Sequence, residues 1–233
     1  MSHAQLPLAL RFPPDQRLER FVGADEALAG ALGAFARGEA SGSLYLHGPP
    51  GSGKSHLGLA LCAEASALGR GVAYLPLAAL AGRLREALEG QESAQLLVLD
   101  GVDAIAGHAD DELALFDVHN RARDRGTLLV YTGSCEPMGL PLALPDLRSR
   151  LAQSTRFALG LLDDEGRREV LRRRAQARGL VLDEAVLDWL LARQGRDLRT
   201  LGAVLDRLDR ASLAHQRRIT VPFVRGLLAS GEA

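Results

Sequence analysis

Hydrophobic residues follow two alternating patterns along the first two thirds of the chain. Short unbroken apolar runs are typical of strands that are buried on both faces of a sheet, and longer segments with apolar residues at helical spacing separate them. Repeated strand–helix units of this kind predict a parallel sheet covered by helices on both faces. The strands are expected at residues 43–47, 72–75, 96–99, 127–131 and 155–159, and the helices at 25–37, from the glycine-rich loop to about Gly69, 80–88 and 112–123.

The last third of the chain has a different pattern, because no further strand is evident beyond Leu162. Four amphipathic segments are each opened or preceded by Asp or Thr, residues that favour the N-cap of a helix. They are expected at residues 163–178, 183–193, 197–215 and 221–228. We therefore expect an extended arm over residues 1–14, an α/β domain over 15–160 and a small α-helical domain over 161–233.

A glycine-rich loop follows the first expected strand and opens the next helix. Its sequence, GPPGSGKS over residues 48–55, matches the P-loop pattern GxxxxGK[ST] at every fixed position. The glycines let consecutive N–H groups face a phosphate, and the positive N-terminus of the following helix adds to the attraction. Lys54 is expected to reach the β- and γ-phosphates, and the Ser55 hydroxyl to bind Mg²⁺. The nucleotide-binding residues predicted for ATP or ADP are Gly48, Pro49, Pro50, Gly51, Ser52, Gly53, Lys54, Ser55 and His56.

The strand at 96–99 ends in Asp100, which we predict as the second Mg²⁺ ligand. An acidic residue at the end of a buried strand, paired with the loop, is the Walker B pattern. The next position matters for turnover, because ATPases of this layout commonly carry there a carboxylate that activates water. Gly101 occupies it, and Asp103 leaves the strand end in a different direction. The sequence therefore predicts nucleotide binding with slow intrinsic hydrolysis.

Composition narrows the function further. The formal net charge of −1 gives no broad basic surface for nucleic acid, which disfavours autonomous DNA binding. Five arginines between residues 167 and 174 form a basic stripe that we interpret as an exposed helix face, with contact to DNA left open. Cys62 and Cys135 are far apart and lack the spacing of a zinc or redox site. There is no signal-like N-terminus and no apolar run of about 18 residues, so a cytoplasmic protein is expected.

With these motifs in place, the chain resembles the DnaA-related family of AAA+ ATPases over nearly its whole length. Phe21 and Val22 look like the segment of that family that packs on the adenine. The segment Thr132-Gly133-Ser134 looks like sensor 1, in which the Ser134 or Thr132 hydroxyl would contact the γ-phosphate or the attacking water. A hydroxyl that caps a turn is the alternative for either residue.

Two arginines carry the rest of the resemblance. Residues 144–151, LPDLRSRL, look like box VII, whose second arginine, Arg150, would enter the nucleotide site of a neighbouring subunit. An arginine supplied in trans is worth roughly 10³–10⁵ in the rate of phosphoryl transfer. Arg148 lies close enough for the assignment to shift by two residues. Residues 196–201 look like sensor 2, and Arg199 would contact the phosphates of the chain's own nucleotide.

Within the family the resemblance is to the short, regulatory Hda type. The sequence ends at Ala233, soon after the expected helices, so the helix-turn-helix domain with which initiators read DNA is expected to be absent. Near the other end, Gln5, Leu6, Leu8 and Leu10 look like a peptide that docks on the sliding clamp, the β subunit of DNA polymerase III, by inserting alternate apolar side chains.

The resemblance implies a regulator that contacts DNA indirectly through the clamp. It would promote hydrolysis of DnaA-bound ATP, with DnaA and the clamp as partners, and would self-associate as a homodimer. Two alternatives remain at this point. One is an autonomous AAA+ ATPase such as a helicase loader, and the other is a clamp-independent, DnaA-like accessory factor.

Overall fold

A parallel sheet of five strands forms the centre of the larger domain. The computed structural model describes residues 17–91, 93–193, 198–215 and 219–229. The strand order in space is β2-β3-β4-β1-β5, so β4 lies between the strands that carry the two Walker motifs. The expected five-stranded parallel sheet is confirmed. The strands are β1 (Ser43–His47), β2 (Val72–Pro76), β3 (Leu96–Asp100), β4 (Leu128–Gly133) and β5 (Thr155–Ala158).

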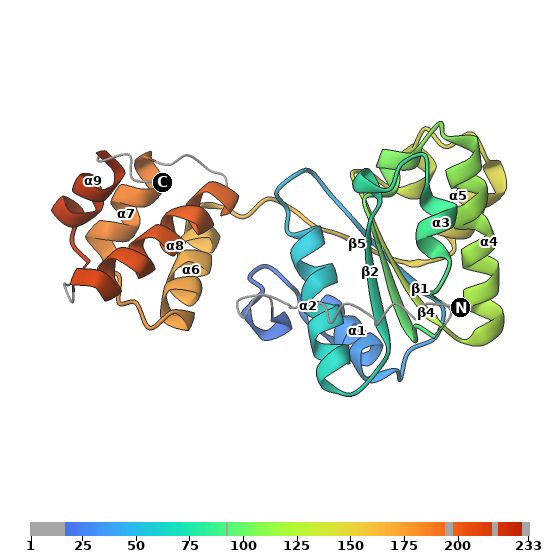
Figure 1. Cartoon of the computed structure of the whole chain (residues 1–233), viewed down its shortest axis with the longest axis horizontal. Helices are drawn as coiled ribbons and strands as arrows, with labels where there is room; N and C mark the ends of the chain where they lie inside the picture. The colour runs from blue at the N-terminus through green and yellow to red at the C-terminus, as the bar shows by residue number, and fades with distance from the viewer. Residues whose placement is uncertain (1–16, 92, 194–197, 216–218, 230–233) are drawn as a thin grey trace, which may run out of the picture.

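Helices cover both faces of this sheet (Figure 1). On one face lie α1 (Glu26–Arg37) and α2 (Lys54–Ala67). On the other face lie α3 (Leu84–Leu88), α4 (Ala109–Arg125) and α5 (Pro145–Ala152). Short 3₁₀ helices precede or connect these elements: η1 (Leu18–Arg20), η2 (Leu77–Ala79), η3 (Val102–Ile105) and η4 (Pro137–Gly139).

The apolar runs divide between the two layers because successive residues of a strand point to opposite faces. In β3, Leu96 and Val98 join the core beneath α1 and α2, while Leu97 and Leu99 join the core beneath α3 and α4. An unbroken apolar run is therefore what a central strand of this sheet requires.

Two helices differ from the sequence prediction. The helix expected at 80–88 is confirmed only in its second half, because η2 ends at Ala79 and α3 begins at Leu84. Gly82 interrupts the segment with a φ of +82°, and the Asp111 carboxylate accepts hydrogen bonds from the N–H groups of Gly82 and Leu84. The sequence also gave no expectation of α5, which begins at Pro145 in the box VII segment.

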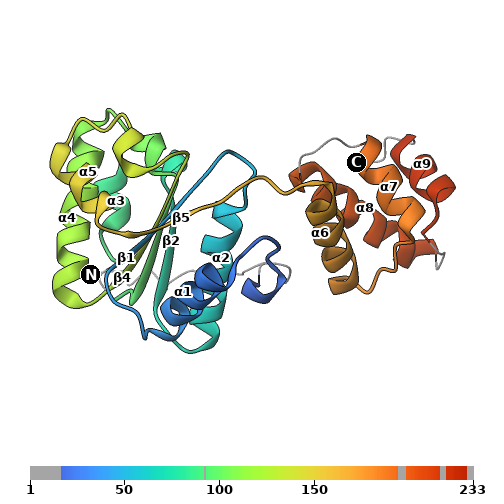
Figure 2. The same ribbon diagram turned by 180° about the vertical axis from the view of Figure 1, so that it is seen from behind.

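The C-terminal third forms a separate helical unit, as the pattern predicted. It consists of α6 (Asp164–Ala177), α7 (Glu184–Arg193), α8 (Leu198–His215) and α9 (Val221–Ala229). Leu171, Leu187 and Leu205 are among its fully buried residues, so this unit has a hydrophobic core of its own. It stands to one side of the sheet domain, joined by the chain that follows β5 (Figures 1 and 2). Among the described residues, no helix is long and apolar enough to span a membrane.

Candidate functional site

The glycine-rich loop lies between the end of β1 at His47 and the start of α2 at Lys54. Gly48 has a φ of +153° and Gly53 a φ of +95°, and neither position has room for a side chain. A Cβ at Gly48 would overlap the carbonyl oxygen of Leu159, and one at Gly53 would lie 2.7 Å from a ring carbon of Phe21. The loop therefore has the curled backbone that a phosphate-binding loop needs.

Lys54 lies directly over this loop. Its Nζ donates hydrogen bonds to the carbonyl oxygens of Gly48 at 2.6 Å and Pro49 at 2.9 Å. Burial lowers the pKa of Lys54, and the carboxylates of Asp103 and Asp100 act in the opposite direction. The ammonium group is thus held at the mouth of the loop. A bound phosphate would replace the two carbonyl groups as its hydrogen-bond partner.

The Asp100 carboxylate accepts hydrogen bonds from hydroxyl groups of three elements. Ser55 Oγ on α2 and the Tyr74 hydroxyl on β2 donate to Oδ2 at 2.7 Å and 2.6 Å. Thr132 Oγ1 on β4 donates to Oδ1 at 2.6 Å and accepts the N–H of Gly101 at 2.8 Å. The strand order explains this cluster, because β2 and β4 flank β3 and all three strands end at the same edge.

The donor set at Asp100 fits a magnesium ion. Mg²⁺ prefers oxygen ligands and is usually held by one or two protein groups together with substrate phosphates. Ser55 Oγ and Asp100 Oδ2 are such oxygens and lie within 2.7 Å of each other. The described residues contain no group of three or more His, Cys, Asp or Glu that could form a metal cage by themselves. A cation here would therefore depend on the nucleotide.

The position that usually carries the water-activating carboxylate has no side chain. Gly101 has a φ of +85° and begins the turn into η3. Asp103, within η3, accepts the backbone N–H of Ser134 at 2.5 Å, and the side chain of Ser134 is exposed. Of the two hydroxyls considered for sensor 1, it is that of the fully buried Thr132 that contacts Asp100.

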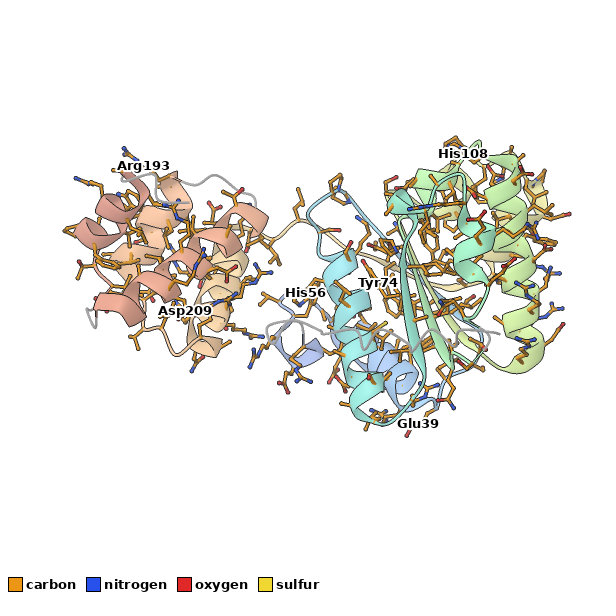
Figure 3. The ribbon with its side chains drawn as sticks, viewed as in Figure 1. Glu39, His56, Tyr74, His108, Arg193 and Asp209 are labelled. Carbon is orange, nitrogen blue, oxygen red and sulfur yellow. The ribbon has the colours of Figure 1, made fainter. Side chains whose placement is uncertain are left out.

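A pocket opens between the loop, the segment after η1 and the helical unit. Its lining includes Phe21, Val22 and His56 together with Leu162, Arg173 and Arg174. The rings of Phe21 and His56 lie 6.0 Å apart, and Figure 3 shows His56 on the side of α2 that faces the helical unit. Apolar and aromatic walls with basic groups beside a phosphate loop are suited to a nucleotide.

Comparison with known proteins agrees with this geometry. Residues 44–154 match the family model described as ATPase family associated with various cellular activities (AAA), and residues 164–228 match the model described as Hda, lid domain. The two matches together span most of the chain. The chain is a DnaA-related AAA+ protein of the Hda type.

Solved structures share its fold at low sequence identity. Domain III of the replication initiation protein DnaA from Thermotoga maritima is 23% identical with a TM-score of 0.73, covering 94% of this chain and 98% of that one. AMPPCP-bound DnaA from Aquifex aeolicus is 21% identical with a TM-score of 0.70, covering 89% and 69%. The Holliday junction branch migration motor RuvB from Thermotoga maritima is 18% identical with a TM-score of 0.65, covering 94% and 72%. As an AAA+ protein, this Hda-type chain binds ATP or ADP.

The remaining predicted residues of this Hda-type protein lie at three places. Arg199 belongs to the first turn of α8, next to Leu198 at the pocket, but its side chain is outside the described part of the structure. Arg148 and Arg150 lie on α5, which is remote from the lid helices in both views (Figures 1 and 2). The clamp-binding peptide over residues 5–10 is also outside the described residues.

The basic stripe on α6 is largely paired with acidic residues. Arg172 forms ion pairs with Glu169 and Glu184, both at 2.8 Å, and Arg173 pairs with Glu169 at 2.7 Å. Arg168 also pairs with acidic residues of α6 and α7. These contacts favour the interpretation as a helix face over a nucleic-acid surface.

Sequence reasoning missed two polar side chains whose hydrogen bonds connect neighbouring elements. The pattern predicts Tyr74 only as one residue of an apolar strand, and its contact with Asp100 depends on strand order, which the sequence pattern does not give. The pattern predicts Glu112 only as the start of a helix, although its side chain is fully buried. An acidic residue in the first turn of a helix is ordinarily a favourable exposed charge, so no signal distinguished it.

Proposed function

We propose that this Hda-type protein is a regulator that promotes hydrolysis of the ATP bound to DnaA, and so represses re-initiation of chromosome replication. Its own nucleotide, with Mg²⁺ held by Ser55 and Asp100, keeps the sheet domain and lid in a competent arrangement. Arg150 acts as an arginine finger in the site of DnaA, where an arginine in trans stabilises the charge on the transferring phosphoryl group.

The observation that carries this proposal is the location of Arg150. The nucleotide pocket lies between the loop and the lid, whereas α5 lies on the face of the sheet packed by α3 and α4, remote from the lid in both views. This location supports a role for Arg150 in the site of a neighbouring subunit rather than in its own pocket. Gly101 also supports action on a partner rather than in the chain's own site, since it leaves that site without the carboxylate that usually follows the Walker B aspartate.

The roles of the other predicted residues follow within this proposal. When bound, Mg²⁺ supplies charge neutralisation at the phosphates, and the oxygens of Ser55 and Asp100 hold it. Arg199 contacts the phosphates from α8, and the hydroxyl of Ser134 or Thr132 senses the γ-phosphate. The Thr132 hydroxyl is fully buried and already engaged with Asp100 and Gly101, which supports Ser134 for that role.

Recruitment to DNA is assigned to the N-terminal peptide. Gln5, Leu6, Leu8 and Leu10 dock on the sliding clamp, which brings the protein to newly replicated DNA in the nucleoid. The near-neutral net charge and the paired arginines of α6 support an indirect contact with DNA.

Self-association is a further part of the proposal. In a homodimer formed through the face that bears α5, each Arg150 would be covered, and the bound nucleotide would control its release. Analytical ultracentrifugation with ADP and without nucleotide tests this, and a monomer under both conditions excludes it.

The test of the whole proposal follows [γ-³²P]ATP that is bound to DnaA before mixing. Loss of labelled ATP should require both this protein and clamp loaded on DNA, and the Gln5→Ala/Leu6→Ala variant should fail at ordinary clamp concentrations. The protein alone should turn over ATP slowly. Steady turnover by the protein alone, with no effect on DnaA, would instead identify an autonomous ATPase. Full activity of the peptide variant without clamp would identify a clamp-independent factor.

A further inference from the structure

Glu112 is a buried carboxylate that has no part in the nucleotide site. It lies in the first turn of α4, and its side chain is fully buried. Its two oxygens accept three backbone N–H groups: Gly107 at 2.7 Å and Ala143 at 3.0 Å on Oε1, and Leu144 at 2.7 Å on Oε2. A buried charge is tolerated when hydrogen bonds of this kind surround it.

These hydrogen bonds fix the beginning of α5. Leu144 is the N-cap residue of that helix, and its own side chain makes no capping hydrogen bond. Pro145, the first helical residue, has no N–H to donate. Leu147 and Leu151 bury the inner face of the helix without fixing its start. The start of α5 is therefore tied to α4 through Glu112.

We infer that Glu112 is a positioning residue that sets the direction of α5 and, through it, the aim of Arg150; this rests on the proposed function. Arg150 lies six residues beyond Leu144, about 9 Å along the helix axis. A change in the direction of the helix at its start is therefore carried to the guanidinium group. Misplacement of a catalytic group by about 1 Å can lower a rate about 100-fold.

The carboxylate is suited to this task because it accepts hydrogen bonds at both oxygens and donates none. In a Glu112→Gln variant, the amide nitrogen would face at least one of the three N–H donors. Two donors would then oppose each other in a buried place, and the start of α5 would have to shift.

The neighbouring residue Asp111 is a matched control. It belongs to the same turn of α4, its residue is 3% exposed, and its carboxylate also accepts two backbone N–H groups. Those groups belong to Gly82 and Leu84, at the start of α3. Asp111→Asn disturbs a buried carboxylate of the same helix without touching α5.

The experiment measures single-turnover hydrolysis of the ATP bound to the partner ATPase at rising concentrations of this protein. Glu112→Gln should lower the maximal rate about 10- to 100-fold and leave the half-saturating concentration within about twofold, since a misdirected finger still docks. Asp111→Asn should keep the maximal rate within about threefold of the unaltered protein. Hydrogen–deuterium exchange should be faster over residues 143–152 in Glu112→Gln and unchanged there in Asp111→Asn.

A second variant covers the case in which Glu112→Gln does not fold. Leu144→Pro deletes the N–H donor to Oε2 and keeps the carboxylate, and the φ of −87° at Leu144 lies within about 10° of the range that proline adopts. Like Glu112→Gln, it should lower the maximal rate of hydrolysis and make hydrogen–deuterium exchange faster over residues 143–152.

The outcomes separate this inference from the proposed function. If Arg150→Ala abolishes stimulation while Glu112→Gln and Leu144→Pro leave the rate and the exchange unchanged, the positioning role is overturned and the proposed function stands. If Arg150→Ala retains full stimulation, the finger assignment fails. In that case, unchanged exchange over 143–152 in Glu112→Gln overturns the role in positioning α5, and faster exchange supports it.

Discussion

The Tyr74 hydroxyl donates a 2.6 Å hydrogen bond to the Asp100 carboxylate from the neighbouring strand β2. Burial, reinforced by the Asp100 carboxylate, raises the pKa of Tyr74 and keeps it a protonated donor. The orientation of the proposed Mg²⁺ ligand thus depends on a residue outside both Walker motifs.

Replacing Tyr74 by phenylalanine should therefore lower the affinity for the Mg²⁺ that accompanies the nucleotide. Loss of a hydrogen bond to a metal-ligating carboxylate typically costs about 10- to 100-fold in metal affinity, and we expect the lower end because Ser55 and Thr132 remain. The measurement is a Mg²⁺ titration of fluorescent ADP binding. Tyr131→Phe is the control, since that hydroxyl bonds to His119 and not to Asp100. Equal Mg²⁺ titrations for unaltered protein and Tyr74→Phe would refute the role.

Phe21→Ala should separate recognition of the base from recognition of the phosphates. Stacking on an aromatic ring contributes about 1–3 kcal/mol per base, so affinity for ADP should fall at least about fivefold. Inorganic pyrophosphate has no base, and its affinity should stay nearly constant. Calorimetric titration with both ligands checks this. An equal loss of affinity for both ligands would mean that Phe21 supports the phosphate-binding loop and does not contact the base.

Lys54→Ala should lose affinity for ADP and pyrophosphate together. A hydrogen bond to a charged group contributes about 1.5–3 kcal/mol, which corresponds to about 10- to 100-fold in affinity. The same calorimetric titrations measure it. Retention of pyrophosphate binding by Lys54→Ala would contradict the assignment of the loop as the phosphate site.

His119 should make stability depend on pH. Burial, followed by the charges of Arg150 and Arg123, lowers the pKa of His119 below its ordinary value of about 6.5. The unfolded chain then binds more protons than the folded chain as the pH falls below that value, so stability is lost on acidification. Thermal unfolding between pH 7.5 and 5.5 should show this loss, and His119→Asn should show a shallower slope. Equal slopes of stability against pH for the unaltered protein and His119→Asn would exclude His119 as the source of the pH dependence.

The sequence was sufficient for features that are local in the chain. The loop over residues 48–55, the strand ending in Asp100 and the four lid helices all follow from periodicity, capping and glycine placement. The sheet was also predictable, because runs such as Leu96 to Leu99 fit a strand covered on both faces.

Features that depend on tertiary contacts were not predictable. The late start of the helix expected at 80–88 was not predictable, because Asp111, distant in sequence, accepts the N–H groups of Gly82 and Leu84. The start of α5 is fixed by Glu112 across a comparable separation. Tyr74 reaches Asp100 because β2 lies beside β3, and strand order leaves no trace in a pattern of apolar residues.

The central claim is that Arg150 acts in the nucleotide site of DnaA, and one comparison tests it most directly. DnaA loaded with [γ-³²P]ATP is mixed with DNA-loaded clamp and either Arg150→Ala or the matched variant Arg148→Ala, and hydrolysis is followed in a single turnover. We predict that Arg150→Ala loses at least about 1,000-fold in rate, as expected of an arginine finger, while Arg148→Ala retains most of it and both variants bind ADP normally. Stimulation by Arg150→Ala equal to that of the unaltered protein would contradict the account.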